Sequence, residues 1–193
     1  MFESLPDIPR LFTALTEWGA ALVYVFVVAR SASSNALSPN AAIPRWRLAA
    51  AAVGGFVVLV GAQELLGRAP LSLWVPGMMT AYALVWCVIR VGTALDWRWV
   101  THMSARAFIV AELAASLAWQ VVVYSHADKP YWHPLSFGGF AVIAATCLAV
   151  VYVFERRVFR QGALPVLRFA DLVSGVFIGI AIFALSNLSF IST

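Results

Sequence analysis

The sequence predicts an all-α fold, a polytopic membrane protein in which six transmembrane helices form one bundle. Hydrophobic residues make up 62% of the 193 residues and charged residues 11%, whereas soluble domains carry about 25% charged residues. The chain also contains six apolar stretches, each close to the roughly 20 residues that a helix needs to cross a bilayer. A water-soluble protein of this length could not bury so much apolar surface, so we expect the excess to face lipid.

The expected spans are separated by segments whose residues belong in water or among lipid headgroups. Arg30 and a run rich in Ser, Asn and Pro follow the first span. Gly67-Arg68 closes the second span, the charged stretch 96–98 the third, the polar loop 126–134 the fourth and the charged segment 155–165 the fifth. The spans cover residues 11–28, 48–66, 71–91, 107–124, 135–154 and 170–190. We expect a single domain over residues 1–193, because no linker or internal repeat divides the chain.

The distribution of basic residues predicts the orientation, because cytoplasmic loops collect Lys and Arg. Ten basic residues lie in the odd-numbered loops: Arg30, Arg45, Arg47, Arg90, Arg98, Arg106, Arg156, Arg157, Arg160 and Arg168. Three lie on the opposite side: Arg10, Arg68 and Lys129. The odd loops are therefore expected in the cytoplasm and both termini outside, in the cell membrane. This topology also explains the net charge of +4, so we expect no nucleic-acid partner.

Two carboxylates in the outer halves of consecutive spans are the first candidate site residues, because ionisable groups inside a membrane are costly and are often functional. Glu17 lies about two turns into the first span, beside Trp18, and Glu64 lies near the outer end of the second. Facing each other, they could bind a cationic ligand or share a proton. Alternatively, Glu64 reaches the headgroups and pairs with Arg68 at i+4.

Two further acidic residues are expected in structural roles. Glu112 lies inside the fourth span, and we expect it to form an interhelical ion pair with Arg90 or Arg106. Asp171 follows Arg168 by one turn at the start of the sixth span. A carboxylate there can satisfy free backbone N–H groups and interact with the helix dipole.

The outer loop 125–134 contains further candidate ligand contacts. His126, Asp128, Trp132 and His133 lie in it. Two imidazoles and a carboxylate without helical spacing or a fourth ligand do not indicate a metal site, so we expect an aromatic lip around an outer pocket instead. The sequence contains no metalloprotease, hydrolase or phosphate-loop motif. We therefore expect no catalytic residues and no cofactor.

Two stretches of the chain resemble a known family. The first expected helix opens Pro9-Arg10-Leu11-Phe12-Thr13-Ala14-Leu15-Thr16-Glu17-Trp18, and the last closes Ala184-Leu185-Ser186-Asn187-Leu188-Ser189-Phe190. Both are similar to parts of the membrane-sensor half of bacterial GHKL-type sensor histidine kinases. In that family a further span and a cytoplasmic ATP-binding domain follow, and the 193 residues contain neither. The resemblance implies a sensor region without its kinase half, acting as a homodimer.

Together these features predict the ligand-sensing membrane module of a two-component signal-transduction receptor, with no catalysis on this chain. An extracellular peptide or other amphipathic ligand would enter between helices near Glu17, Trp18, Glu64 and the loop 125–134. Two other classes stay open. The substrate-binding component of an energy-coupling-factor importer is similar in length and has six helices, but its termini face the cytoplasm. In a membrane scaffold, Glu17 and Glu112 would belong to structural ion pairs.

Overall fold

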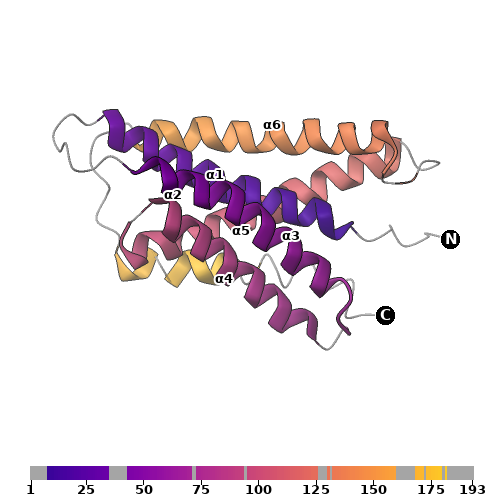
Figure 1. Cartoon of the computed structure of the whole chain (residues 1–193), viewed down its shortest axis with the longest axis horizontal. Coiled ribbons are helices and arrows are strands. Elements are labelled where there is room, and N and C mark those ends of the chain that lie inside the picture. The colour runs from indigo at the N-terminus through magenta and orange to yellow at the C-terminus, as the bar shows by residue number, and fades with distance from the viewer. Residues whose placement is uncertain are drawn as a thin grey trace.

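The computed structural model describes residues 8–34, 43–70, 73–93, 95–125, 130, 132–159, 168–171, 173–179 and 181. This part of the chain is helical and contains no strand. Its elements, in chain order, are α1 (Arg10–Ser34), α2 (Arg45–Ala49), the π-helical turn η2 (Ala50–Gly54), α3 (Gly55–Leu66), α4 (Trp74–Thr93), α5 (Trp97–Ser125) and α6 (Pro134–Phe159). They form one bundle (Figure 1), as the all-α prediction required.

Within the described residues, five helical segments are long and apolar enough to cross a bilayer. They are Arg10–Ser31, Arg45–Leu66, Val75–Thr93, Trp97–Ser125 and Pro134–Phe159. These segments correspond to the first five expected spans. Within the sixth expected span the structure describes a shorter apolar helix, Phe169–Gly179. Because residues 182–193 lie outside the described residues, the sixth span stays a prediction.

The second span is one continuous helix with an irregular turn in its middle. The chain passes from α2 through η2 into α3 without leaving the helical backbone conformation. A π-turn interrupts the regular hydrogen-bond ladder of a helix and lets side chains reach its carbonyl groups. The indole N–H of Trp18 donates to the carbonyl of Ala52 at 2.8 Å, which fixes α1 against this turn.

The fourth expected span begins ten residues earlier than the sequence suggested. We expected residues 107–124, whereas α5 starts at Trp97. Asp96 explains the earlier start, because its carboxylate accepts the backbone N–H of Arg98 at 3.3 Å and its carbonyl accepts that of Val100 at 3.0 Å. A carboxylate in this position satisfies N–H groups that have no partner within the helix. Arg106 therefore lies inside a helix and not in a loop.

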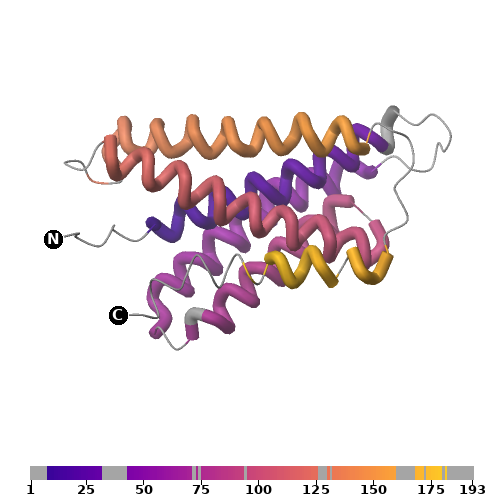
Figure 2. Tube along the Cα trace, turned by 180° about the vertical axis from the view of Figure 1, so that it is seen from behind, coloured from indigo at the N-terminus to yellow at the C-terminus, as the bar shows by residue number. Residues whose placement is uncertain are grey.

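Helix α1 is the central element of the bundle. It contacts α3, α4, α5 and α6, and Figures 1 and 2 show it running between α6 and the α3–α4 pair. Ala20 and Val25 on α1 are fully buried, whereas Val142 on α6 is 67% exposed. In a membrane such an exposed valine faces lipid. The N-terminal span is thus the axis on which the other spans pack.

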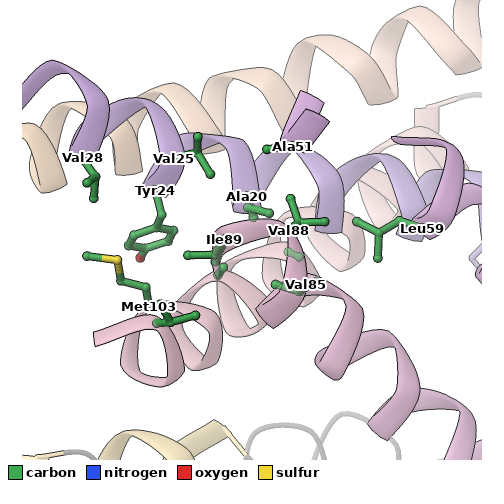
Figure 3. Close-up of a cluster of buried hydrophobic side chains, with 14 residues drawn as sticks. Ala20, Tyr24, Val25, Val28, Ala51, Leu59, Val85, Val88, Ile89 and Met103 are labelled. Carbon is green, nitrogen blue, oxygen red and sulfur yellow. The ribbon is translucent and has the colours of Figure 1, made fainter. Parts of the chain in front are cut away.

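One apolar cluster fills the middle of the bundle, where α1, η2, α3, α4 and α5 meet. We call it the central apolar cluster. Figure 3 draws its 14 residues and labels Ala20, Tyr24, Val25, Val28, Ala51, Leu59, Val85, Val88, Ile89 and Met103. Gly92 permits close packing at its edge, since a Cβ atom there would lie 2.7 Å from the side chain of Val25. Tyr24 belongs to this cluster through its ring, and its hydroxyl reaches a buried polar group described below.

Candidate functional site

A carboxylate and an amide meet in the interior of the bundle, between α1 and α3. Glu17 and Gln63 are both fully buried. The side-chain N–H of Gln63 donates to Glu17 Oε1 at 2.9 Å. Placing a carboxylate away from both water and a bonded cation is unfavourable, so a single amide hydrogen bond leaves this group poorly compensated.

The same region has more hydrogen-bond acceptors than donors. Glu17 Oε2, Gln63 Oε1 and Glu112 Oε1 are buried oxygens without a hydrogen-bond partner. Helix α5, which carries Glu112, packs against α1, and the charge of Glu112 acts on Glu17. We call Glu17, Gln63 and Glu112 the acceptor cluster. Buried polar atoms are nearly always satisfied in folded proteins, so unpaired oxygens on Glu17 and on its partner Gln63, with a third on the neighbouring helix α5, indicate a group that can receive a ligand.

Arg10 is the cation associated with the acceptor cluster. Its charge acts on both Glu17 and Glu112. The side chain of Arg10 passes over Gly67, where a Cβ atom would lie 3.0 Å from Arg10 Cγ. The guanidinium is nevertheless bonded to neither carboxylate, since no ion pair joins these described residues. It lowers the net negative charge of the region without satisfying the oxygens.

A second group of buried polar side chains joins α1, α5 and α6. The hydroxyl of Tyr24 donates to Glu155 Oε1 at 3.2 Å, and the guanidinium of Arg106 forms an ion pair with the same oxygen. Glu155 is 3% exposed, while the side chain of Arg106 is 47% exposed. We call Tyr24, Arg106 and Glu155 the ion-pair cluster. Here the carboxylate has the charged partner that Glu17 lacks.

Two helices contribute to both clusters. Helix α1 carries Glu17 and Tyr24, which are seven residues apart and therefore on the same face, separated by about 10 Å along the axis. Helix α5 carries Glu112 and Arg106, which are about 9 Å apart along its axis. The third residue comes from α3 in the acceptor cluster and from α6 in the ion-pair cluster. Helices α1 and α5 thus link the two polar groups physically.

The structure brings Gln63, not Glu64, to Glu17. Glu64 and Arg68 are both exposed, and these two described residues form no ion pair with each other. Successive residues on a helix point about 100° apart, so burying Gln63 turns Glu64 towards the surface of the bundle. Trp18 is half-buried, and its N–H already binds the Ala52 carbonyl. Of the residues predicted for the outer site, only Glu17 belongs to the acceptor cluster.

The ion pair expected between Glu112 and Arg106 is not formed. Arg106 pairs with Glu155, because Arg106 and Glu112 are six residues apart and so face different sides of α5. Arg90 is exposed at the end of α4, where its carbonyl accepts a bond from Arg47 at 3.2 Å. Glu112 Oε1 is left without a partner, which is why Glu112 joins the acceptor cluster instead.

The remaining predicted residues lie at helix starts or outside the described residues. Asp171 Oδ2 accepts the backbone N–H of Arg168 at 3.0 Å, the reciprocal bond of a capping box. The ring nitrogen Nδ1 of His133 accepts the backbone N–H of Leu135 at 3.3 Å at the start of α6. Trp132 is exposed next to it. His126 and Asp128 lie outside the described residues, and the described residues contain no group of three metal ligands.

Three members of the two clusters escaped prediction from the sequence. Gln63 carries no charge, whereas its neighbour Glu64 does, so the charge pattern indicated Glu64 as the site residue. Glu155 precedes Arg156-Arg157 and resembles the end of a span. Tyr24 lies within the apolar first span, where no charged neighbour marks it. The seven-residue spacing of Glu17 and Tyr24 was the available signal, since it places both on one face of α1.

The fold defines a multi-pass helical membrane protein. Its interior contains two groups of buried polar side chains, the acceptor cluster and the ion-pair cluster. No family model, no curated protein and no solved structure matches this chain. Its function is therefore inferred from the arrangement of its own residues.

Proposed function

We propose that this chain is the ligand-sensing membrane module of a sensor-kinase-type receptor, without catalysis of its own. In this proposal six helices cross the cytoplasmic membrane and both termini lie outside. The acceptor cluster receives the ligand from the outer side, and helices α1 and α5 carry the response to the ion-pair cluster on the inner side. The resemblance of residues 9–18 and 184–190 to sensor histidine kinases supports the receptor class.

Charge segregation in the bundle supports this orientation. The start of α2 lies beside the end of α4, because Arg47 Nε donates to the Val91 carbonyl at 2.7 Å. The start of α5 lies beside the end of α6, where the rings of Trp99 and Phe159 are 6.4 Å apart. This end carries most of the described basic residues: Arg45, Arg47, Arg90, Arg98, Arg156 and Arg157. Such an end belongs in the cytoplasm by the positive-inside rule.

The direction of the Phe169–Gly179 helix supports a sixth span. A Cβ atom on Gly175 would lie 3.5 Å from His102, and one on Gly179 would lie 3.7 Å from Ile109. The segment therefore runs parallel to α5, away from the basic end. Continued in the same direction, it would cross to the outer side, as the proposed topology requires.

One observation carries the sensing proposal: α1 and α5 each contribute a residue to both clusters. A ligand can shift a conformational equilibrium only if it binds one arrangement better than another. A group bound at Glu17 and Glu112 changes the interaction between α1 and α5 at one level. Because the helices are stiff, Tyr24 and Arg106 must respond at the other level, where both bind Glu155.

The signalling test joins the chain to a transmitter. The full chain is followed by one added span and a sensor-kinase catalytic domain, and autophosphorylation is measured in membrane vesicles. We expect Glu17→Gln to change autophosphorylation several-fold, while Glu64→Gln, the exposed carboxylate next to Gln63, leaves it unchanged. Equal activity in wild type, Glu17→Gln and Tyr24→Phe would refute the coupling of these clusters to a transmitter.

An orientation test separates this proposal from the importer alternative. Single cysteines at Trp132 and at Arg157, introduced after Cys87→Ser and Cys147→Ser, are labelled in intact cells with a membrane-impermeant maleimide. We expect labelling at Trp132 and none at Arg157 until the cells are opened. The reverse pattern would place the basic end outside and would refute the proposed topology.

A further inference from the structure

We propose that the acceptor cluster binds one small monovalent cation, a proton or a sodium ion, between Glu17, Gln63 and Glu112. This inference deepens the proposed function, because it names the class of ligand to which the sensing site responds. Its effect on signalling depends on the proposed function, whereas binding of the cation does not.

The count of donors and acceptors at the cluster calls for a positively charged group. An ionised carboxylate only accepts hydrogen bonds, and an amide oxygen likewise accepts. The bond from Gln63 to Glu17 Oε1 satisfies one carboxylate oxygen, and Glu17 Oε2, Gln63 Oε1 and Glu112 Oε1 remain. All three unpaired atoms are oxygens, the ligand type that hard cations prefer. A proton on either carboxylate would equally create the missing donor.

The charges at the cluster indicate a single positive charge. Glu112 and Arg10 are the charged groups that act on Glu17, and Arg10 is the one that acts on Glu112. These come from α1 and α5, α3 contributes the neutral Gln63, and the described parts of α4 and α6 contribute none. Two carboxylates and one guanidinium give a net charge of −1 when all are ionised. One monovalent cation brings this buried region to neutrality, whereas a divalent ion would overshoot.

The position of the cluster suits a small ion. Ionisable side chains inside membrane bundles commonly mark proton or ion sites, and helix-bundle transporters bind their coupling ions between helices near the middle of the bilayer. Glu17 and Gln63 are fully buried, so a ligand must fit among packed side chains. A proton or a sodium ion meets this requirement more easily than a large organic molecule.

The binding test uses the full chain, purified in lipid nanodiscs, and measures the midpoint of thermal unfolding, Tm. One arm varies sodium chloride against choline chloride at constant ionic strength and fixed alkaline pH. The other arm varies pH without sodium. A ligand that binds only the folded state stabilises it in proportion to the logarithm of its concentration. Above the dissociation constant we expect each tenfold increase in the free concentration of the cation to raise Tm by about 3–5 °C.

The two arms distinguish the two cations. Sodium binding predicts that Tm rises with sodium and not with choline. Proton binding predicts that Tm falls as pH rises, since stability decreases with pH wherever the folded state holds more protons than the unfolded state. In either case Glu17→Gln and Glu112→Gln should abolish the dependence. Glu64→Gln is the matched control, because Glu64 is an exposed carboxylate on α3 beside Gln63, and it should preserve the dependence.

The inference is overturned if wild-type Tm is independent of both cations, or if Glu17→Gln and Glu112→Gln retain the wild-type dependence. Should one of these variants fail to fold, the other decides, because the two residues lie on different helices. If the cation binds in nanodiscs but Glu17→Gln leaves autophosphorylation of the fusion unchanged, the cation site stands and the sensing role is refuted. Signalling altered by Glu17→Gln without any cation dependence would refute the site and keep the receptor proposal.

Discussion

Replacing Arg106 by methionine should destabilise the protein by about 2 kcal/mol, because it removes the charged partner of the buried Glu155. Removing one member of a fully buried ion pair costs about 3–5 kcal/mol. Glu155 is 3% exposed but the side chain of Arg106 is 47% exposed, so solvent already weakens the pair and roughly half of that cost applies. The Tyr24 hydroxyl still donates to Glu155 at 3.2 Å, and methionine retains the packing of the arginine stem.

The decisive measurement is a double-mutant cycle. Glu155→Met alone should cost about 1 kcal/mol, since the half-exposed Arg106 can turn to water while the Tyr24 hydroxyl loses its acceptor. The double variant Arg106→Met/Glu155→Met should lie within about 1 kcal/mol of wild type, because an apolar pair can replace a buried ion pair at little cost. The expected coupling between the two positions is therefore about 2 kcal/mol.

These free energies come from reversible unfolding of the purified chain in mixed micelles. Unfolding is induced by titration with SDS and followed by far-UV circular dichroism. The exposed Arg90→Met serves as a control, since Arg90 lies at the same end of the bundle and makes no described ion pair. A double variant that is destabilised by the full sum of the two single variants would show zero coupling. That result would refute the ion pair and, with it, the inner half of the proposed connection between clusters.

Three further predictions concern packing around α1 and are checked by the same unfolding titration. Gly92→Ala should lower the free energy of unfolding by about 1–3 kcal/mol, because its Cβ would lie 2.7 Å from a valine of α1. Its control, Gly61→Ala, would meet no atom within 4 Å and should be neutral or stabilising. Trp18→Phe should cost about 1 kcal/mol, since the 2.8 Å bond to the Ala52 carbonyl is lost. Phe12→Ala should cost about 2–4 kcal/mol, because Phe12 is fully buried among aromatic rings; a loss below 1 kcal/mol would contradict this packing.

The sequence was sufficient to predict the first five spans because length and hydropathy are what a bilayer selects. It misplaced the start of α5 because charged residues near a helix end resemble a loop. Arg98 and Arg106 suggested water, whereas Asp96 caps a helix whose first turns continue the bundle. The amphipathic first turns bury Val100 and Met103. A transmembrane helix thus extends beyond its apolar stretch where its polar side chains are capped or bonded within the bundle.

The acceptor cluster was predicted only in part, for a physical reason. Glu17 could be recognised because a carboxylate deep in a span is expensive wherever it points. Its partner depends on how α3 is rotated about its own axis. Residues 55–62 are apolar or glycine on every face, so no polar stripe specifies which side faces the bundle. A rotation of about 100° decides between Gln63 and Glu64, and that rotation follows from packing that involves residues far away in the sequence.

The interface between α1 and α5 explains why polar contacts at two levels can control it. The two helices pack against each other, and many of their buried residues are small: Ala14, Ala20 and Ala21 on α1, and Ala107, Ala111, Ala114, Ala115 and Ala118 on α5. Small residues let helices approach closely, but they interdigitate little and so give weak resistance to a slight shift of one helix along the other, the shear motion of packed helices. Directional bonds that join both helices to α6, those of Tyr24 and Arg106 to Glu155, then contribute to the relative position of α1 and α5. In the proposed site, a cation bound between Glu17 and Glu112 adds a bond between α1 and α5 at the acceptor cluster, where oxygens are unpaired. The proposal therefore predicts that occupancy of the acceptor cluster changes how strongly the two helices are held together at the ion-pair cluster.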